Sequence, residues 1–288
     1  MPATLPTRLD LSPIAKRLQD HYTVFGHIPN LTLEEAGRFL NDCMALMFPH
    51  FADHKSSSGP ELEARLMTLA GRLRFILCEV RPENCPKTDD IVSEFVQALP
   101  DIAEDIRRDA QAILENDPAA TSLNEVILAY PGLRAVAAYR IAHRLVRHGV
   151  GEFPRLIGEY AHQRTGVDIN PTAQIGRSLF LDHGTGIVIG GTAVIGDNVK
   201  IYQGVTLGAL RVKRNGHQEK RHPTIEDNVT IYANATILGG DTVIGRNCVI
   251  GGNVWITKSV PANEVVMYKS GWQGRAEPEP ESADHYAI

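Results

Sequence analysis

Apolar residues recur at every third or fourth position along the first half of the chain, which is the spacing of one face of an α-helix. Between Pro60 and Val80 the apolar stripe consists of Leu62, Leu66, Leu69, Leu73 and Leu77. Thr32, followed by Glu35, predicts the start of another helix, because this pair can form a capping box. Breaks between helices are expected at Pro86, Pro100, Pro131 and Gly149. Residues 1–166 are therefore predicted to form a helical bundle, a kind of domain that often mediates assembly.

From Asp168 onward, large apolar residues recur at every sixth position. The runs, separated by short shifts and one interruption, are Ile175, Leu181, Ile187; Ile189, Ile195, Ile201, Leu207; Ile225, Ile231, Ile237; and Ile244, Ile250, Ile256. A helix would need a period of 3.6 and a single strand a period of 2, so a period of six indicates a solenoid. Each hexapeptide supplies one short strand with an inward Ile or Leu and one turn of Gly, Asn or Asp. Residues 167–262 are therefore predicted to form a β-helix with three hexapeptides in each triangular coil.

A charged stretch interrupts the six-residue period between residues 208 and 222. A solenoid tolerates an insertion that loops out, and loops on a rigid scaffold are suitable places for active-site residues. Residues 263–288 form a last segment, of which the final part is rich in Pro, Glu and Ser and lacks an apolar period. This composition predicts a flexible tail.

Charge and cysteine content narrow the class of protein. The net charge is −5, so no basic excess argues for nucleic-acid binding. No apolar run approaches the roughly 18 residues that span a bilayer, and the N-terminus lacks the apolar core of a secretory signal. We therefore expect a cytoplasmic protein without membrane or nucleic-acid partners. None of the cysteines forms a C-x-x-C pair, so free thiols in a reducing cytosol are expected at Cys43, Cys78, Cys85 and Cys248.

Several segments between Asp117 and Pro261 resemble the serine O-acetyltransferases among the hexapeptide-repeat acyltransferases. They are NDPAA, AYRIAHRL, VDINPTAQIG, LDHGTGIVIG, TAVIGDNV, QGVTLG and RHPTI. Hexapeptide repeats alone occur in many acyl and nucleotidyl transferases, whereas LDHGTGIVIG between VDINP and RHP is much more specific. The resemblance implies that the coils wind left-handed. The expected fold is therefore α+β, with an N-terminal α-helical bundle followed by a left-handed parallel β-helix.

The resemblance implies acetyl transfer from acetyl-CoA to the serine hydroxyl, giving O-acetyl-L-serine and CoA in the first step of cysteine biosynthesis from serine. A neutral hydroxyl is a poor nucleophile, so a general base must take its proton. His183 matches the family's base, and an imidazole ordinarily titrates near pH 6.5. Asp168 matches the carboxylate that orients it. The two lie fifteen positions apart, close to one coil, so they can lie on adjacent coils at one corner.

Further residues match the family's substrate sites. Asp117 and Asp182 correspond to residues that bind the amino and hydroxyl end of serine. Arg221 and His222 correspond to residues that hold its carboxylate, for which a guanidinium is well suited. Acetyl-CoA would lie in a groove between neighbouring solenoids, where the small residues Ala209 and Ala233 would let the pantetheine arm approach the backbone.

The resemblance also implies partners. The family forms homotrimers through the solenoid, commonly paired into hexamers through the helical half. The C-terminal Ile288 matches the residue that inserts into the active site of O-acetylserine sulfhydrylase. Acetyl-CoA is expected as a co-substrate, with no permanently bound cofactor and no metal.

The sequence departs from the family pattern at three places. Gly191 stands where the family commonly has Glu, and the insertion before Arg221 is longer than in the commonest members. The repeats end in VPANEVVMYKSGWQGR, whereas the family has a GVPAR-like close. These departures concern the substrate pocket, the closure of the loop and the CoA-facing end.

Three alternatives remain open from the residues alone. The acceptor could be homoserine or a sugar; homoserine is one methylene longer, a difference worth about 1–3 kcal/mol of discrimination. A zinc site built from His183, His217 and His222 is a second alternative, although no H-x-x-x-x-H spacing occurs. A non-catalytic assembly subunit is the third, and it would not need the His183–Asp168 pair.

Overall fold

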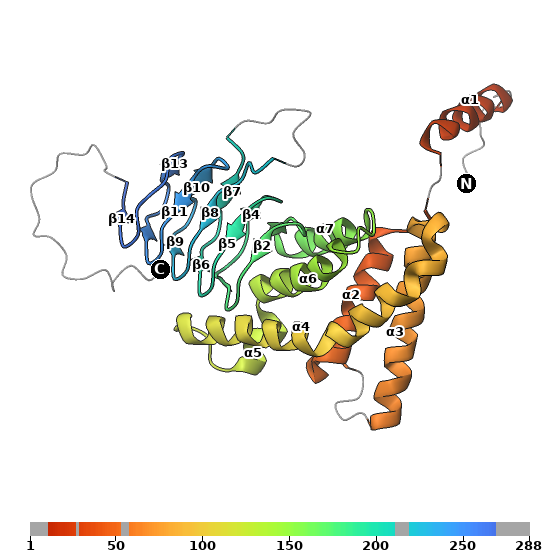
Figure 1. Cartoon of the computed structure of the whole chain (residues 1–288), viewed down its shortest axis with the longest axis horizontal. Helices are drawn as coiled ribbons and strands as arrows, with labels where there is room; N and C mark the ends of the chain where they lie inside the picture. The colour runs from red at the N-terminus through yellow and green to blue at the C-terminus, as the bar shows by residue number, and fades with distance from the viewer. Residues whose placement is uncertain (1–10, 27–28, 53–57, 211–218, 269–288) are drawn as a thin grey trace, which may run out of the picture.

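The protein consists of a helical half followed by a coiled β half, as the computed structural model in Figure 1 shows. The structure describes residues 11–26, 29–52, 58–210 and 219–268. The α-helices are α1 (Ser12–Tyr22), α2 (Leu33–Met47), α3 (Gly59–Val80), α4 (Thr88–Asn116), α5 (Leu123–Ala129), α6 (Pro131–Val146) and α7 (Phe153–Thr165). Short 3-10 helices lie between them at η1 (Thr23–Phe25), η2 (Pro49–Phe51) and η3 (Pro82–Lys87). In the described residues, no helix has both the length and the apolarity needed to cross a membrane.

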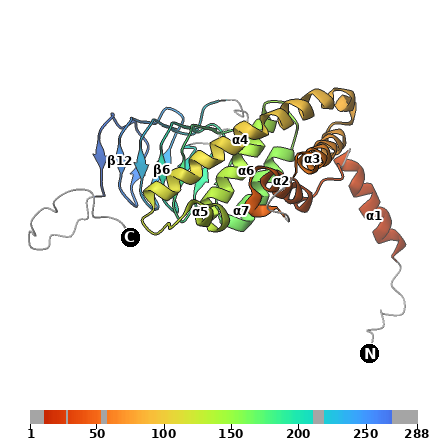
Figure 2. The same cartoon turned by 90° about the horizontal axis from the view of Figure 1, so that it is seen from below.

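The apolar stripes of the helical half pack into one core. Thr32 Oγ1 accepts a hydrogen bond from the Glu35 backbone N–H at 3.1 Å, as the expected capping box requires. Pro131 occupies the first position of α6, where proline is tolerated because its missing N–H would have no helical partner. Figure 2 shows α2, α3, α6 and α7 grouped together, while α1 projects away from this body.

Helix α4 continues through Pro100, so the break expected there is wrong. Proline inside a helix removes one backbone hydrogen bond and costs about 3 kcal/mol. The cost is offset because the buried stripe runs across the proline without a change of spacing, through Val92, Phe95, Leu99, Ile102 and Ile106. Burial of such side chains is worth about 1.5–3 kcal/mol each. Pro100 itself is exposed, so its ring does not disturb this face.

Two of the cysteines form a disulfide, so the expectation of free thiols is wrong for Cys78 and Cys85. Cys78 lies in the last turn of α3 and Cys85 in η3, with their Cα atoms 4.6 Å apart. The chain reverses at Pro82, and this reversal brings the half-buried cysteines within bonding distance. Cys43 and Cys248 are free and buried, and burial raises the pKa of the Cys43 thiol well above its ordinary value.

The β half is a solenoid of three parallel sheets. Sheet A has the order β1-β4-β7-β10-β13, sheet B the order β11-β8-β5-β2, and sheet C the order β14-β12-β9-β6-β3. The strands are β1 (Asp168–Ile169), β2 (Gln174–Ile175), β3 (Phe180–Leu181), β4 (Val188–Ile189), β5 (Val194–Ile195), β6 (Lys200–Ile201), β7 (Thr206–Gly208), β8 (Thr224–Ile225), β9 (Thr230–Ile231), β10 (Thr236–Leu238), β11 (Val243–Ile244), β12 (Val249–Ile250), β13 (Trp255–Ile256) and β14 (Val265–Val266). The residues with six-residue spacing fill its interior, and only Ile175 among them is less than fully buried. We call the edge where the chain passes from sheet C to sheet A the CA corner, and the edge between sheets A and B the AB corner.

Asparagines form the edge between sheets B and C. Asn198, Asn228, Asn247 and Asn263 all have positive φ, a conformation that asparagine tolerates better than most residues. Their side-chain amides donate along the stack from one coil to the next at 2.8–3.3 Å. The repeated Asn in the segments GDNV, EDNV and GRNC thus builds one continuous ladder along the solenoid.

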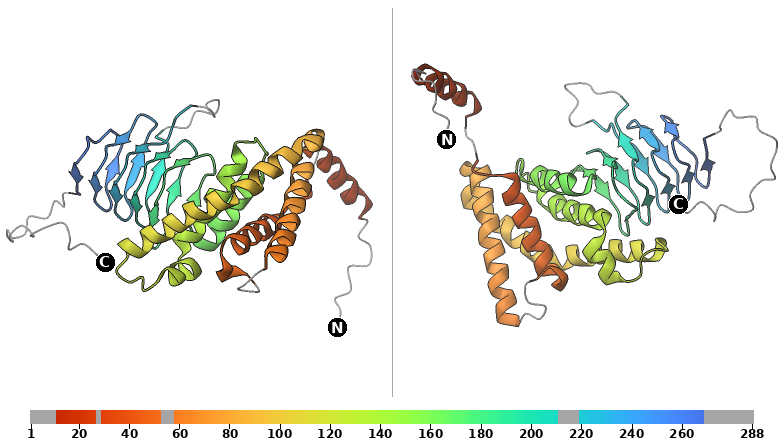
Figure 3. Two further views of the ribbon diagram at one scale, coloured as in Figure 1. Left: turned by 60° about the horizontal axis from the view of Figure 1, so that its bottom comes forward. Right: turned by 180° about the vertical axis from the view of Figure 1, so that it is seen from behind.

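A buried ion pair joins the helical half to the first coil. Arg140 of α6 donates to both carboxylate oxygens of Asp109 of α4 at 2.9 Å, and also to the carbonyl oxygens of Ile175 and Gly176. Asp109 in turn accepts the Leu179 backbone N–H at 2.9 Å. Figures 2 and 3 show α4 extending from the helices along the side of the solenoid. These contacts fix α4 relative to the edge between sheets B and C in the first coil.

Candidate active site

His183 lies on a corner that is longer than the others. The CA corner between β3 and β4 contains residues 182–187, whereas the next CA corner contains only residues 202–205. The extra residues correspond to the two-residue shift in the six-residue period. His183 has a φ of 54°, which turns it outward, and its side chain is 61% exposed. An exposed imidazole on a rigid corner is accessible to a substrate, as a general base must be.

Two carboxylates stand beside this corner. The Oδ1 atom of Asp182 lies 3.7 Å from Nδ1 of His183. Burial raises the pKa of Asp182, the positive form of His183 lowers it, and the nearby Asp117 raises it further. Asp117 ends α4, so a residue from the helical half reaches the corner of the solenoid. Two neighbouring carboxylates favour a cationic group between them, such as an ammonium.

Tyr130 completes this group, and sequence reasoning did not identify it. Its hydroxyl donates to Oδ2 of Asp117 at 2.6 Å, while Oδ1 of Asp117 accepts the Ala119 backbone N–H at 2.8 Å. The bond to Asp117 raises the pKa of Tyr130, and burial raises it further, so the phenol remains a donor. The only signal in the sequence was its place before Pro131 at the start of a helix, which by itself does not indicate a binding residue.

The structure pairs Asp168 with Arg155 instead of His183. Asp168 lies on β1, and its Oδ1 atom is 3.6 Å from Nη1 of Arg155 on α7. Within the described part of the chain, no hydrogen bond or ion pair joins Asp168 to His183. Asp168 is in register with Val188, the residue that begins the strand after the His183 corner. The two residues therefore lie near the same edge of the solenoid, but the ring nitrogen of His183 faces Asp182.

Glu159, His162 and Asp168 place three potential metal ligands within 4.8 Å of one another. Arg155, however, forms ion pairs with both Glu159 and Asp168. His162 Nδ1 lies 3.3 Å from Glu159. A guanidinium thus already neutralises the carboxylates that a cation would need, so this group is better described as an ion-pair network.

Arg221 and His222 lie at the AB corner, across sheet A from His183. His222 is buried, and its Nδ1 accepts the Thr192 backbone N–H at 3.1 Å. This contact leaves the proton of the neutral ring on Nε2. Burial lowers the pKa of His222, and the adjacent Arg221 and Lys220 lower it further. The chain thus supplies the two proposed ends of the serine site at different corners of its own solenoid.

Thr192 and Lys220 fix the segment that carries Arg221. Thr192 Oγ1 accepts the backbone N–H groups of Arg221 and His222 at 2.9 and 3.1 Å. Lys220 Nζ donates to the carbonyl oxygens of Thr192 and His222 at 2.9 and 2.6 Å. Part of the insertion, residues 211–218, lies outside the described residues, and so does His217. The end of the insertion is nevertheless held closely against the AB corner.

Two glycines at the AB corner have no room for a side chain. A Cβ at Gly190 would lie 2.0 Å from Cδ2 of His222. A Cβ at Gly191 would lie 2.5 Å from Oγ1 of Thr172, which donates to the Gly191 carbonyl at 2.8 Å. Gly190 therefore allows His222 to pack on the backbone. The unusual Gly191 is explained by the close approach of Thr172.

The remaining expected site residues are spread over both corners. Ala209 follows β7 at the AB corner, and Ala233 lies between β9 and β10 at the CA corner; both are half-buried. Ala233 lies on the same corner as His183, two coils further along the solenoid. Ile288 belongs to residues 269–288, which lie outside the described residues.

Comparison with known proteins agrees with this architecture. Residues 65–138 match the family model described as "Serine acetyltransferase, N-terminal", and residues 222–258 match "Bacterial transferase hexapeptide (six repeats)". A plasmid-encoded serine acetyltransferase of Synechococcus elongatus is 42% identical over 256 residues, which cover 81% of this chain and 80% of the relative.

Solved structures show the same similarity. Serine acetyltransferase isoform 3 of Entamoeba histolytica, in complex with cysteine, is 34% identical with a TM-score of 0.73 and 84% coverage of both chains. The Neisseria gonorrhoeae serine acetyltransferase, in complex with serine, is 28% identical with a TM-score of 0.55, over 86% of this chain and 98% of that one. The expected fold class, a helical bundle followed by a left-handed parallel β-helix, is thereby confirmed. The identity over most of both sequences and the shared fold together show that this chain belongs to the serine acetyltransferase family.

Proposed function

We propose that this protein transfers the acetyl group of acetyl-CoA to the hydroxyl of L-serine, giving O-acetyl-L-serine and CoA, with His183 as the general base. The reaction is the first step of cysteine biosynthesis from serine. The observation that carries this assignment is the outward His183 on the long CA corner, with Asp182 3.7 Å away and the Tyr130–Asp117 pair beside it. The solved relatives that hold serine or cysteine support an amino acid as the acceptor.

His183 first removes the proton of the serine hydroxyl as that oxygen attacks the thioester carbonyl. The resulting C–O bond gives a tetrahedral intermediate, whose negative oxygen must be met by N–H donors. The C–S bond then breaks, and the CoA sulfur leaves with the electron pair. The imidazolium of His183 returns the proton to this sulfur, so the base is regenerated.

Asp168 is the proposed orienting carboxylate for the imidazolium. The His183 side chain is exposed, so it can turn away from Asp182. Asp168 lies on β1, which pairs with β4, the strand that follows the His183 corner. A carboxylate in this position stabilises the imidazolium and selects one tautomer. Arg155 would then hold the Asp168 carboxylate in place until serine is bound.

The serine ammonium is proposed to bind between Asp117 and Asp182, where two carboxylates share a partly buried space. Its carboxylate is assigned to Arg221 and to Nε2–H of His222. Because these residues lie across sheet A from His183, we propose that a neighbouring protomer supplies them. A homotrimer of solenoids would bring one CA corner against the AB corner of the next chain. Residues 1–166 would pair two trimers into a hexamer.

Acetyl-CoA is proposed to occupy the groove between adjacent solenoids. Ala233 on the CA corner and Ala209 on the AB corner would form its opposite walls, where methyl side chains leave room for the pantetheine arm. No permanently bound cofactor is part of this proposal. Acetyl-CoA and serine are cytoplasmic metabolites, and we assign the enzyme to the cytoplasm on that basis.

The test is CoA-thiol release from acetyl-CoA with serine, homoserine and a panel of sugars as acceptors. Serine should give the highest kcat/KM. Arg221→Ala should raise the KM for serine and leave that for acetyl-CoA nearly unchanged, because only the carboxylate contact is lost. A preference for homoserine or a sugar would contradict the proposed acceptor. Equal weakening of both substrates in Arg221→Ala would indicate a collapsed loop instead.

Ile288 is proposed to bind O-acetylserine sulfhydrylase, because a C-terminal carboxylate behind an apolar side chain mimics an amino-acid substrate. Calorimetric titration of that enzyme with the full chain and with a chain lacking Ile288 tests this. The deletion should abolish binding. Unchanged affinity, or no binding by the full chain, would contradict the proposal.

A further inference from the structure

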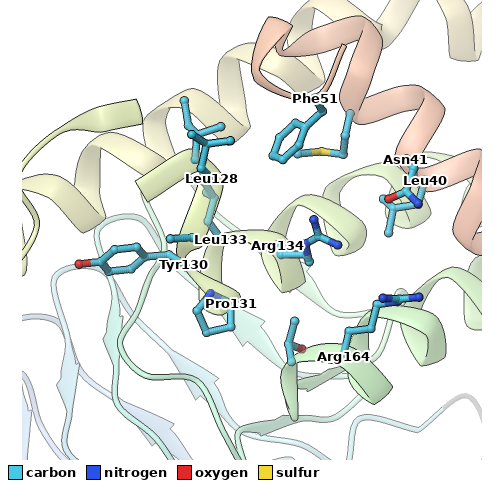
Figure 4. A pocket seen from close by; sticks show the side chains of 13 residues that line it. Leu40, Asn41, Phe51, Leu128, Tyr130, Pro131, Leu133, Arg134 and Arg164 are labelled. Atoms are coloured by element: carbon cyan, nitrogen blue, oxygen red, sulfur yellow. The ribbon is translucent and has the colours of Figure 1, made fainter. Parts of the chain in front are cut away.

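A cavity of about 530 Å³ lies in the helical half between α2, α5, α6 and α7. Figure 4 shows Arg134 of α6 between the apolar side chains of α5 and α2, with Arg164 on the neighbouring α7. Its volume falls within the range of about 300–1,000 Å³ that is usual for small-molecule sites. None of the residues proposed above for serine or acetyl-CoA, apart from the supporting Tyr130, lines it.

The charge of the cavity has one sign. Arg134 and Arg164 line it, and no Asp or Glu does. Neither guanidinium has an acidic partner among the described residues. The guanidinium of Arg164 lies over the ring of Tyr160, with its central carbon 4.5 Å from the ring centroid. This contact orients the guanidinium but brings no negative charge to it. Most other arginines of the helices form ion pairs with carboxylates. These are Arg38, Arg72, Arg74, Arg107, Arg108, Arg140 and Arg155.

The rest of the wall is largely apolar. Leu40 and Met44 come from α2, Leu133 from α6 and Leu128 from α5. Leu40, Met44 and Leu133 are buried, so this side of the wall is held by the core and is already formed. Leu128 is 56% exposed, so this apolar side chain of the wall is accessible to a ligand. The single amide is that of Asn41, whose nitrogen donates weakly to the Tyr160 hydroxyl at 3.5 Å.

We propose that this cavity binds a small molecule with an anionic head and an apolar body. The head, a carboxylate or a phosphate, would lie between Arg134 and Arg164, since a guanidinium donates two parallel N–H groups to either anion. The body would cover Leu128 and the wall formed by α2. The cavity shares only Tyr130 with the residues at the His183 corner, and neither arginine belongs to them, so this binding does not depend on the proposed transfer reaction.

The experiment measures binding of benzoate, phenyl phosphate and benzyl alcohol to the intact enzyme by calorimetry or ligand-observed NMR. Benzoate and phenyl phosphate are the carboxylate and phosphate probes, and benzyl alcohol has the same apolar body without charge. Both anions should bind, the tighter one identifying the preferred head, and benzyl alcohol should bind about tenfold more weakly or less. Added salt should weaken the binding of the anions but not that of the alcohol.

The variants are Arg134→Gln combined with Arg164→Gln, and Arg177→Gln as a control. Arg177 is an exposed arginine on the solenoid, so its variant removes one charge far from the cavity. The double variant should lose about tenfold or more in affinity for both anions, and the control should lose none. Unchanged kcat and KM for serine without probe show that the double variant is folded.

Three results would overturn the proposal. The first is equal anion affinity in wild type and the double variant, which would place the probes elsewhere. The second is benzyl alcohol binding as tightly as benzoate, which would remove any role for the arginines. The third is no binding of either anion to the wild type.

Discussion

Arg140 and Asp109 form an ion pair that is almost completely removed from solvent, with side-chain exposures of 9% and 0%. It connects α4 and α6 to the first coil through the carbonyl oxygens of Ile175 and Gly176 and the N–H of Leu179. Asp117 and Tyr130 come from the helices and His183 from the solenoid, so this pair, together with the Tyr139 hydroxyl that donates to the Ala173 carbonyl, contributes to how the two parts of the site meet.

Replacing Arg140 by Met should destabilise the protein by about 3–5 kcal/mol, because it leaves the Asp109 carboxylate buried without a partner. Urea unfolding followed by circular dichroism measures this at fixed protein concentration. Arg108→Met is the matched control: Arg108 pairs with Glu104 at the surface, where such pairs contribute at most about 1 kcal/mol. Similar losses in the two variants would show that the buried pair has no special role.

Replacing His183 by Gln should lower kcat by about 100- to 10,000-fold, the range expected for removal of a positioned general base. Binding of acetyl-CoA, measured by calorimetry, should be retained. His148→Gln is the control, since this histidine lies beside Glu94 in the helical half. Near-native turnover of serine by His183→Gln would remove His183 from the mechanism.

Asp168→Asn and Asp182→Asn should affect different kinetic parameters. Asp168→Asn should lower kcat by about 100-fold or more, because an orienting carboxylate acts on the imidazolium formed in the transition state. Asp182→Asn should chiefly raise the KM for serine, since it removes an attraction to the ammonium. The opposite result would make Asp182, the carboxylate nearest to His183 in the structure, the orienting group.

Gly190→Ala should raise the KM for serine roughly tenfold, the cost of one displaced hydrogen bond of about 1.4 kcal/mol. Its Cβ would lie 2.0 Å from the His222 ring, so the ring must leave the position in which Nδ1 contacts Thr192. Gly71→Ala is the control, because nothing lies within 4 Å of a Cβ there. An unchanged KM for serine in Gly190→Ala would separate His222 from substrate binding.

Stability should fall as the pH decreases below about 6.5, because burial holds the pKa of His222 below its ordinary value. Above this pH both folded and unfolded chains carry a neutral His222, so there is no effect. Below it the unfolded chain binds the proton first, so the free energy of unfolding decreases as the pH falls. The loss stops growing, but remains, once the pH is below the lowered pKa of the folded chain. In His222→Asn, whose Oδ1 can replace Nδ1 as acceptor, the urea midpoint should fall less between pH 7.5 and 5.5. An identical fall would exclude His222 as a source.

The sequence was least informative about contacts that follow from no repeat. Asp168 was expected beside His183, but in the structure it pairs with Arg155 of α7. The six-residue period gives no information about contacts with the helices. The sequence did not mark Tyr130 as a site residue. Its role is seen only in the fold, where its hydroxyl lies 2.6 Å from Oδ2 of Asp117 at the end of α4. The Cys78–Cys85 disulfide likewise depends on a reversal at Pro82 that follows no repeat.

The six-residue period was enough to predict the solenoid and the residues of its interior. Each coil buries the same hexapeptide position against an equivalent residue of the next coil, as Ile195 does against Ile225, so the period alone identifies the residues that point inward. The shift between Ile187 and Ile189 was seen in the sequence, but only the strand bounds showed that it lengthens the corner that carries His183. The positions of His183 and His222 on opposite edges of sheet A became clear only from the folded chain. A repeat fixes which side chains face the core, but the partners of an outward side chain come from whichever helix or neighbouring chain packs against that corner.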